Sequence, residues 1–493
     1  MNTTIRKILL GLALLPATAS AQKKYEPTWE SIDSRPVPGW FEDAKFGIFI
    51  HWGVYSVPAW APKGVYSEWY QYWLQRKQVS GNNSPNDLAV YNYHKNRFGE
   101  NYSYYSFADQ FKAEDYDPDA WAKLLEKSGA KYVVLTSKHH DGFALWPSKE
   151  ASKAFNRPWN SMETGSHRDL LGELTTAVKK TPVKMGYYYS LYEWYNPLYT
   201  SQQYEKYVDE HMFPQIRELV NNYKPDIIWT DGEWEQSDTT WKSKDIIAWM
   251  YNESPVKESI VVNDRWGKGI RQKHGGYYTT EYEAGAKFNR PWEECRGMGF
   301  SFGYNRNEDI EDYNSPQALV LLLTDVVSSG GNLLLDIGPD AHGKIPPIMQ
   351  ERLLQIGKWL AVNGEAIYGT RKWKQPAQWT AGNREYKQKG GHMASGEYIL
   401  KQTVDPDPEF AVKQIFFTAK GNDLYAIAPV LPEGRWLIKD VTPAAGTTVK
   451  LLGSDKKIGW KKVAGGIELD VPKFTAKELP GDYAYTFKLT NVK

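Results

Sequence analysis

This chain of 493 residues has a single cysteine, no long apolar run and almost no excess of charge. Cys295 is the only cysteine, which excludes a disulfide within the chain and lipid attachment near the N-terminus. No apolar stretch approaches the roughly 20 residues that span a bilayer, so we expect no membrane span. The 60 basic and 59 acidic residues nearly cancel. This balance argues against a nucleic-acid partner or an acidic membrane surface.

Two signatures of metal sites are missing as well. No His-x-His pair ends the first expected strand, and no His-Glu-x-x-His helix occurs. His51, His139, His140 and Asp231 could still supply histidine and carboxylate ligands to one metal ion. A metal hydrolase therefore remains an alternative on the residues alone.

What is present begins with a leader segment. Arg6 and Lys7 form a basic start, residues 8–15 form a short apolar run, and Ala19-Ser-Ala21 offers a small-residue cleavage site. This pattern predicts a signal peptide over residues 1–21 that is removed on export. An exported protein without disulfides is typical of the bacterial periplasm or the cell exterior.

Strands and helices alternate over residues 22–370, which predicts a parallel, TIM-like β/α barrel. The expected strands are 46–53, 131–136, 183–190, 226–231, 260–265, 276–281, a seventh near 301–304, and 332–338. The expected helices are 119–128, 169–178, 203–222, 319–327 and 351–362. An aromatic segment over 66–73 should form a loop and a short helix over the mouth of the barrel.

The pattern changes after about residue 370. Short strands separated by glycine, proline and asparagine occur at 415–417, 423–427, 436–438, 467–471 and 483–489. Regular short strands without helices predict an antiparallel β-sandwich over residues 371–493. We expect this domain to pack against the barrel as a structural support, with sugar binding as the alternative.

Polar residues gather where the barrel strands are expected to end. They are His51, His139, His140, Tyr189, Asp231, Arg265 and Glu281. The carboxyl ends of barrel strands carry the chemistry of this fold, so these side chains should converge. Taken alone, Asp231 could simply begin an Asp-Gly turn. Together, their excess of histidine, tyrosine and arginine over carboxylates fits a sugar site better than a metal centre.

The chain also resembles a known family, the α-L-fucosidases of glycoside hydrolase family 29, and within it the tissue-type branch. The resemblance runs from residue 35 to about residue 370 and fits the C-terminal sandwich too. The motifs that carry it lie at 45–53, 67–70, 129–143, 188–194, 229–235, 262–266, 292–295, 302–304 and 331–339.

The resemblance implies a retaining exo-glycosidase that removes terminal α-L-fucose from fucosylated oligosaccharides or glycoconjugates, with no cofactor and no metal. Asp231 matches the nucleophile of the family. The positions that match fucose-binding residues are His51, Glu68, Trp69, His139, His140, Tyr189 and Arg265. The hypothesis competes with a carbohydrate-binding protein without catalysis, and with a hydrolase of a related sugar such as α-L-galactose.

The general acid/base is the least determined residue, because four glutamates follow Arg265. They are Glu281, Glu283, Glu293 and Glu294. Glu281 ends an expected strand, whereas Glu293 follows Trp292 in what we take to be a loop. A neighbouring indole can raise the pKa of a carboxyl group by desolvation, which suits an acid. We therefore favour Glu293 and keep Glu281 as the substrate-binding or alternative acid residue.

Overall fold

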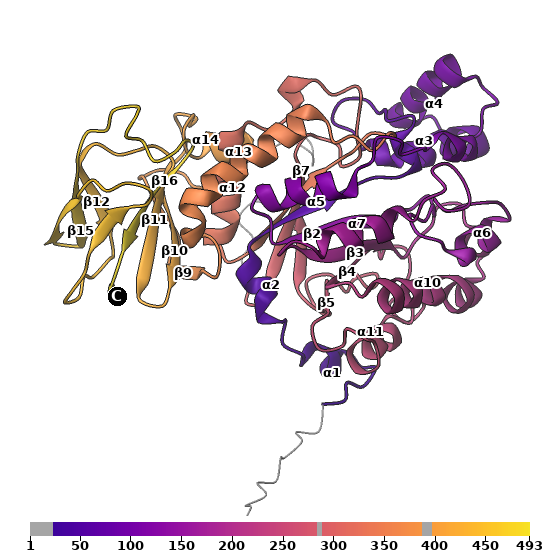
Figure 1. Ribbon diagram of the computed structural model, residues 1–493, viewed down its shortest axis with the longest axis horizontal. Coiled ribbons are helices and arrows are strands. Elements are labelled where there is room, and N and C mark those ends of the chain that lie inside the picture. Colours follow the sequence, from indigo (N-terminus) through magenta and orange to yellow (C-terminus); the bar gives the residue numbers. More distant parts are fainter. Residues whose placement is uncertain (1–22, 283–287, 387–396) are drawn as a thin grey trace, which may run out of the picture.

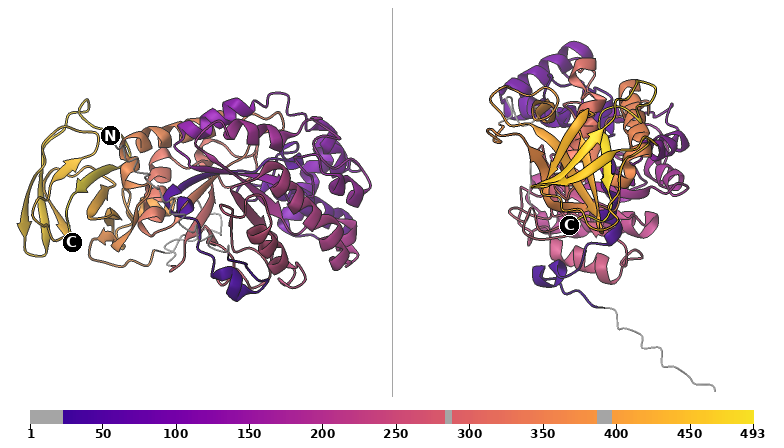
Figure 2. Two further views of the ribbon diagram at one scale, coloured as in Figure 1. Left: turned by 60° about the horizontal axis from the view of Figure 1, so that its bottom comes forward. Right: turned by 90° about the vertical axis from the view of Figure 1, so that its left-hand side faces the viewer.

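The protein is described here by a computed structural model that covers residues 23–282, 288–386 and 397–493. Figures 1 and 2 show a large barrel and, at one end of the long axis, a smaller group of strands formed by the C-terminal part of the chain. The expected signal peptide over 1–21 and the candidate Glu283 lie outside the described residues.

Eight parallel strands form the barrel, in the order β5-β4-β3-β2-β1-β8-β7-β6. They are β1 (Phe46–Ile50), β2 (Tyr132–Lys138), β3 (Lys184–Ser190), β4 (Ile227–Asp231), β5 (Val261–Val262), β6 (Tyr278–Glu281), β7 (Trp292–Gly297) and β8 (Asn332–Ile337). Most of their residues are aromatic or β-branched and are buried on both faces, as in parallel sheets covered by helices. The predicted TIM-like fold is confirmed.

The ring is weakest between β5 and β6, because no ladder joins these strands in the described part of the chain. Two backbone hydrogen bonds link the segments instead, from Gly276 N to Asn263 O and from Tyr277 N to Val262 O, each 3.1 Å. The strand expected over 260–265 is therefore much shorter than predicted. Arg265 lies beyond its end, on the loop that leads toward the barrel mouth.

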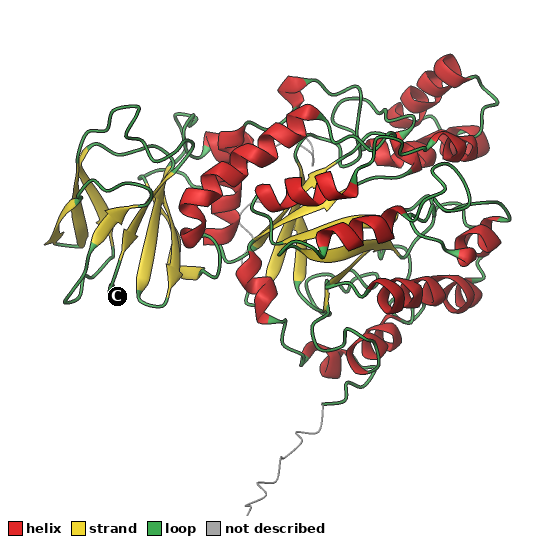
Figure 3. Ribbon diagram, in the orientation of Figure 1, coloured by secondary structure: helices red, strands yellow, loops and turns green. Residues whose placement is uncertain are grey.

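Helices surround the strands, and Figure 3 shows them in red around the yellow barrel. Those of the barrel domain are α1 (Trp29–Asp33), α2 (Gly39–Ala44), α3 (Tyr70–Ser80), α4 (Pro85–Phe98), α5 (Pro118–Lys127), α6 (Lys149–Phe155), α7 (Leu170–Val178), α8 (Pro197–Thr200), α9 (Tyr204–Tyr207), α10 (Phe213–Glu218), α11 (Ser243–Asn252), α12 (Pro316–Ser328) and α13 (Pro347–Asn363). The segments of 3₁₀ helix are η1 (Val54–Ser56), η2 (Ser67–Trp69), η3 (Tyr104–Gln110), η6 (Ile310–Asp312) and η7 (Gly364–Ala366), and those of π helix are η4 (Val208–Met212) and η5 (Leu219–Tyr223).

Helix α4 was not predicted, although its start carries a recognisable signal. The Ser84 hydroxyl accepts a hydrogen bond from Asp87 N, and Pro85 occupies the first helical position. Both features favour a helix N-terminus, and Gly99 follows the last turn. The apolar face of this helix is too sparse for periodicity to reveal it.

The predicted seventh strand is wrong. Strand β7 is Trp292–Gly297, and it begins nine residues before the segment expected near 301–304. The sequence does not look like a buried strand because it contains the charged residues Glu294 and Arg296. In the fold these two residues are buried as an ion pair, with 2.6 Å between Oε1 and Nε. Glu293 therefore belongs to a barrel strand, where it is paired in register with Asn332 of β8.

Side chains alternate between the inside and the outside of the barrel along each strand. The inner layer is largely aromatic and includes Phe49, Tyr132, Tyr188 and Trp229. Tyr187 and Tyr189, which flank Tyr188, pack instead in the outer core against the helices. This alternation decides which strand residues reach the pocket.

The C-terminal part consists of two antiparallel sheets, as predicted. One has the order β13-β16-β11-β10-β9 and the other β12-β15-β14. Their strands are β9 (Arg371–Trp379), β10 (Lys413–Lys420), β11 (Asp423–Ala428), β12 (Gly434–Lys439), β13 (Val449–Leu451), β14 (Gly459–Val463), β15 (Gly466–Val471) and β16 (Tyr485–Leu489), with α14 (Glu397–Lys401) before β10. A separate apolar core, including Phe417, Leu469 and Phe487, lies between the sheets.

Candidate active site

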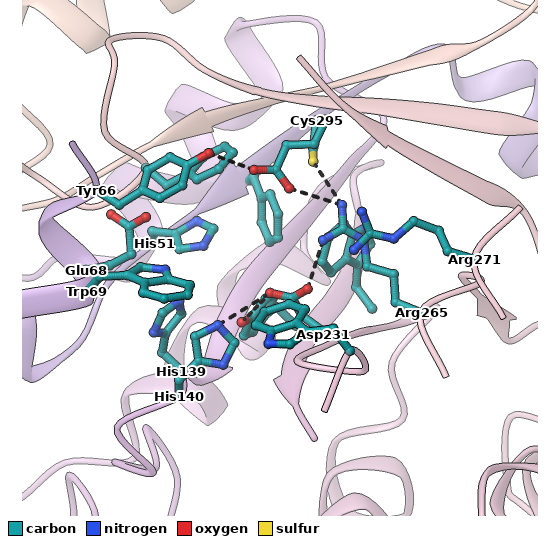
Figure 4. A pocket seen from close by; sticks show the side chains of 16 residues that line it. His51, Tyr66, Glu68, Trp69, His139, His140, Asp231, Arg265, Arg271 and Cys295 are labelled. Carbon is teal, nitrogen blue, oxygen red and sulfur yellow. Dashed lines mark hydrogen bonds and ion pairs between the residues drawn. The ribbon is translucent and has the colours of Figure 1, made fainter. Parts of the chain in front are cut away.

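A pocket of about 260 Å³ lies at the carboxyl ends of the barrel strands. Figure 4 shows Asp231 in its centre, with Arg265 and Arg271 on one side and the histidines and Trp69 on the other. The residues that line it are Phe49, His51, Tyr66, Glu68, Trp69, His139, His140, Tyr188, Trp229, Asp231, Trp234, Arg265, Arg271, Glu281, Cys295 and Phe302.

Asp231 is the last residue of β4, and each oxygen of its carboxylate has a donor. Oδ1 accepts from Nη1 of Arg265 at 2.8 Å, and Oδ2 accepts from the Tyr188 hydroxyl at 3.0 Å. Burial acts to raise the pKa of Asp231, but Arg265, His140 and Arg271 together outweigh it and hold the pKa below its ordinary value. Asp231 is therefore an anion at neutral pH.

The Asp-Gly turn considered from the sequence is also real. Gly232 has φ of 73°, and a side chain there would meet Tyr192 Cβ at 2.9 Å and Ser190 Oγ at 3.0 Å. Only glycine fits this turn without strain. The turn and the pocket carboxylate are thus parts of one arrangement, in which the chain bends sharply just after Asp231.

Arg265 holds a second carboxylate beside the first. Its Nη2 lies 3.3 Å from Oε2 of Glu281, and its Nε donates to Thr279 Oγ1 at 3.0 Å. The hydroxyl of Tyr66 donates to the other oxygen of Glu281 at 2.8 Å. One guanidinium group therefore brings the carboxylates of two strand ends, β4 and β6, to neighbouring positions on the same pocket.

The three predicted histidines converge in the pocket and are uncharged at neutral pH. Burial is the largest cause, and it lowers the pKa of His51 to about 3 and that of His140 to about 4. It lowers the pKa of His139 well below the ordinary value too. Neutral imidazoles donate through one nitrogen and accept through the other, so they suit hydroxyl groups.

Glu68 and Trp69 come from η2, in the predicted aromatic segment. Gly303 N and the Ser301 hydroxyl donate to Oε2 of Glu68, at 2.8 and 3.1 Å. Burial raises the pKa of Glu68 to about 7. The indole of Trp69 packs edge-on against His140 with ring centres 5.7 Å apart. A wall of this kind can hold the apolar C–H face of a sugar.

Two predicted site residues are not brought to the pocket. Tyr189 faces outward, and its hydroxyl donates to Oε1 of Gln215 at 2.8 Å. Glu293 lies inside the barrel below the pocket, where it accepts from the Tyr132 hydroxyl at 2.5 Å and from Trp229 Nε1 at 2.8 Å. Strand alternation explains the first difference, since Tyr188 and not Tyr189 faces the inside of the barrel. Glu293 does face inward, but it is the second residue of β7 and lies too far from the carboxyl end of that strand to reach the pocket, which Glu281 lines instead.

Sequence reasoning missed several lining residues, among them Tyr66, Tyr188, Trp234 and Arg271. Tyr188 could have been found by counting alternate residues back from the end of β3. Arg271 lies on a loop, where its Nη2 binds Oε1 of Glu233 at 2.7 Å. Because no periodicity governs a loop, the sequence holds no signal that would place Arg271 in the pocket.

Two properties of the described residues bear on the remaining alternatives. Within 23–282, 288–386 and 397–493, no helix is long and apolar enough to cross a membrane. The same residues contain no group of three or more histidine, cysteine, aspartate or glutamate side chains placed to hold a metal ion. Cys295 is buried and unpaired with another cysteine.

Comparison with known proteins gives one consistent result along the whole chain. A family profile described as Alpha-L-fucosidase matches residues 12–365, and one described as Alpha-L-fucosidase C-terminal domain matches residues 408–490. The alpha-L-fucosidase of Dictyostelium discoideum is 38% identical over 505 residues, which cover 99% of this chain and 100% of that protein. The tissue alpha-L-fucosidase of Homo sapiens is 38% identical over 496 residues, which cover 99% of this chain and 96% of that protein.

Solved structures agree. The crystal structure of Thermotoga maritima alpha-fucosidase in complex with fucose superposes with a TM-score of 0.74 at 36% identity. The match covers 95% of this chain and 100% of that chain. A structure of the same protein in complex with a mechanism-based inhibitor matches with the same score, identity and coverage.

Proposed function

This chain belongs to the alpha-L-fucosidase family, and on that basis we propose the part that each pocket residue plays in its reaction. The protein is a glycoside hydrolase that acts on fucose linked to a carbohydrate partner. The observation that carries the assignment of roles is the Arg265 guanidinium, which contacts the carboxylates of both Asp231 and Glu281. Two carboxyl groups side by side on one pocket are what a retaining glycosidase requires.

In the first step Asp231 attacks the anomeric carbon of α-L-fucose, and the bond to the leaving oxygen breaks. Glu281, protonated, gives its proton to that oxygen, and the products are a β-fucosyl ester of Asp231 and the free alcohol. In the second step Glu281 takes a proton from water, which attacks the anomeric carbon and releases α-L-fucose. Glu281 replaces Glu293 in this role because it lines the pocket and Glu293 does not.

Recognition of the sugar falls to the neutral groups around the two carboxylates. His51, His139 and His140 would exchange hydrogen bonds with the fucose hydroxyls, and Glu68 would accept one or two more. Trp69 and Trp234 would cover the apolar face of the ring, with their own ring centres 6.4 Å apart. Tyr188 replaces Tyr189 as the tyrosine of this set, and it also holds Asp231.

A stereochemical assay tests this proposal most directly. The full chain is incubated with an aryl α-L-fucoside, and the first-formed anomer is followed by NMR before mutarotation. We expect α-L-fucose, because two inversions retain configuration. First-formed β-fucose would contradict the double displacement, and hydrolysis of an aryl α-L-galactoside alone would contradict the choice of sugar.

The division of the chain into domains, the class of substrate and the compartment of the protein complete the proposal. We propose that residues 22–370 form the catalytic domain, that 371–493 support it, and that the substrates are fucosylated oligosaccharides or glycoconjugates. We also propose that residues 1–21 direct export to the bacterial periplasm or the exterior. N-terminal sequencing of protein secreted by an expressing cell should begin at Gln22, and an intact Met1 on exported protein would contradict cleavage there.

A further inference from the structure

We propose that Asp336, which lies behind the pocket on β8, fixes His51 as a hydrogen-bond donor toward the substrate. Oδ1 of Asp336 is 2.6 Å from Nδ1 of His51. The imidazole lines the pocket, whereas Asp336 does not. The second ring nitrogen, Nε2, is thus the one left to meet a sugar hydroxyl. Asp336 acts through His51 and is a positioning residue.

The geometry gives His51 little freedom to rearrange. His51 is 4% exposed and Asp336 is 1% exposed. The imidazole is stacked on Phe302 with ring centres 5.0 Å apart and planes at 20°. Its backbone is held as well, because His51 N donates to Ile337 O at 3.1 Å. The ring therefore keeps Nδ1 against Asp336, and only the position of the protons remains to be decided.

Counting protons decides the direction of the outer hydrogen bond. If the pair is neutral overall, it carries two protons. Oδ2 of Asp336 has no acceptor beside it among the described residues, so one proton is shared between Oδ1 and Nδ1 and the other lies on Nε2. This holds whether the shared proton sits on oxygen or on nitrogen. If the pair carries one negative charge, only the shared proton remains and Nε2 is a bare acceptor. The net charge of the Asp336–His51 pair therefore determines whether Nε2 donates or accepts a hydrogen bond.

The surroundings favour the neutral pair. Oδ2 of Asp336 is buried and has no hydrogen-bond partner among the described residues, a costly position for a carboxylate oxygen. Burial is the main cause that raises the pKa of Asp336 well above its ordinary value, and the carboxyls of Glu68 and Glu308 add to it. Asp231 and Glu281 act on His51 in the opposite sense to burial, yet its pKa falls to about 3. A protonated Asp336 and a neutral His51 satisfy all of these facts.

His140 provides a contrast on the same side of the pocket. Its Nδ1 is 2.5 Å from the Ser190 hydroxyl, whose own proton is given to Tyr192 O. Ser190 can then only accept, so neutral His140 carries its proton on Nδ1 and presents Nε2 as an acceptor. The pocket would thus offer a donor from His51 and an acceptor from His140. A fixed donor and a fixed acceptor would each bind a sugar hydroxyl in one orientation, because a hydroxyl group can both donate and accept.

Substitution at Asp336 tests the proposal, because asparagine and leucine have nearly the same shape as aspartate. Asp336→Asn can donate its amide proton to Nδ1 and keep the Nε2 proton, so kcat/KM on an aryl α-L-fucoside should stay within about threefold of the wild type. Asp336→Leu leaves Nδ1 unpaired and should lower kcat/KM by about tenfold to a hundredfold. Equal losses in both variants would overturn the proposal, as would full activity of Asp336→Leu.

Asn332→Leu is a matched control on the same strand. It removes a buried hydrogen bond, from Nδ2 to Phe41 O at 2.7 Å, at the end of β8 away from the pocket. We expect it to lower the melting temperature and to leave kcat/KM unchanged. A loss of kcat/KM in this control equal to that in Asp336→Leu would mean that any buried polar substitution on β8 has the same effect, and would overturn the specific role of Asp336.

A second measurement does not depend on activity. Protein labelled with ¹⁵N in its histidine rings should show His51 protonated at Nε2 in the free wild type, with the signal assigned by its absence from His51→Gln. A proton on Nδ1 with bare Nε2 would overturn the proposal. This inference rests on the proposed function only for the identity of the ligand. If the wild type failed to cleave the fucoside, the proposed function would be refuted. The NMR experiment would still show whether Nε2 of His51 carries a proton.

Discussion

The two oxygens of Asp231 are each occupied by a different partner, and this makes the residue a poised anion. Arg265 donates to Oδ1 and Tyr188 donates to Oδ2, and His140 Nε2 lies 3.6 Å from Oδ2. A carboxylate held in this way needs no proton transfer before it attacks. Its geometry is set before substrate arrives, which lowers the entropic part of the barrier.

Replacing this group should abolish turnover without emptying the pocket. In Asp231→Gly the covalent intermediate cannot form, so kcat on an aryl α-L-fucoside should fall by several orders of magnitude. Added azide should restore part of the rate and give a β-fucosyl azide, because a small anion can occupy the space of the lost carboxylate. Near wild-type turnover without azide would remove Asp231 from the nucleophile role.

Glu281 carries a different signature, that of an acid/base. In Glu281→Ala, fucosides with poor leaving groups should lose the most activity, because they depend on protonation of the departing oxygen. The basic limb of the pH–rate profile, which reports loss of the acid's proton, should disappear. Steady-state rates on an activated aryl fucoside and on a fucosylated disaccharide measure the contrast. Equal losses on both substrates would instead assign Glu281 to binding.

At the scale of the element, alternation along a strand separates neighbours that look identical in the sequence. Tyr188 points into the barrel and donates to Asp231, whereas Tyr189 points out and donates to Gln215. Tyr188→Phe should therefore lower kcat/KM by an amount equivalent to about 1.5–3 kcal/mol, the contribution of a hydrogen bond to a charged group. Tyr189→Phe is the matched control and should affect only stability. A reversed result would return Tyr189 to the site.

Strand β7 places Glu293 in the aromatic interior of the barrel, which predicts an unusual dependence of stability on pH. Burial raises the pKa of Glu293 to about 7 in the folded protein, against an ordinary value of 4.5. Between these pH values the folded chain keeps a proton that the unfolded chain releases. The stabilisation is thus complete below 4.5 and is lost as pH rises through about 7.

Glu293→Gln tests this because glutamine cannot ionise. The free energy of unfolding of the variant, measured relative to the wild type in urea, should rise by about 1–3 kcal/mol between pH 4.5 and pH 8. Groups common to both proteins cancel in this difference. The variant should also keep kcat/KM, since Glu293 does not line the pocket. A difference that stays flat with pH, or a large loss of activity, would contradict the burial of an uncharged Glu293.

The same elements show what the sequence could and could not foretell. Runs such as Ile227–Trp229 are apolar and end in a polar residue, so both β4 and its pocket carboxylate were predictable. Strand β7 was not, because Glu294 and Arg296 neutralise each other in the folded state only. Partners distant in sequence, such as Arg265 and Glu281, carry no local pattern at all. The choice of acid/base therefore required the assembled barrel.

At the scale of the whole molecule, the barrel and the C-terminal sheets are joined by a buried ion pair. Nζ of Lys413, on β10, lies 2.7 Å from Oδ1 of Asp325, on α12. The hydroxyl of Tyr398 approaches the other oxygen of Asp325 at 3.4 Å. Figure 1 shows α12 and α13 between the barrel and the C-terminal strands, so this contact lies where the two parts meet. Neither charge reaches the active-site pocket.

This pair should govern stability and leave catalysis alone. Lys413→Met leaves the buried Asp325 carboxylate without its cationic partner. The free energy of unfolding should therefore fall by about 3–5 kcal/mol. The double variant Lys413→Met with Asp325→Leu removes both charges and should recover most of that loss, because apolar side chains of similar size can replace a buried pair. Thermal melting of the wild type, both single variants and the double variant completes the cycle, with kcat/KM measured well below the transition. If the double variant is as unstable as the single variants, the contact between the barrel and the C-terminal sheets depends on the charges themselves. If kcat/KM falls together with stability, the C-terminal sheets shape the pocket as well as support the barrel.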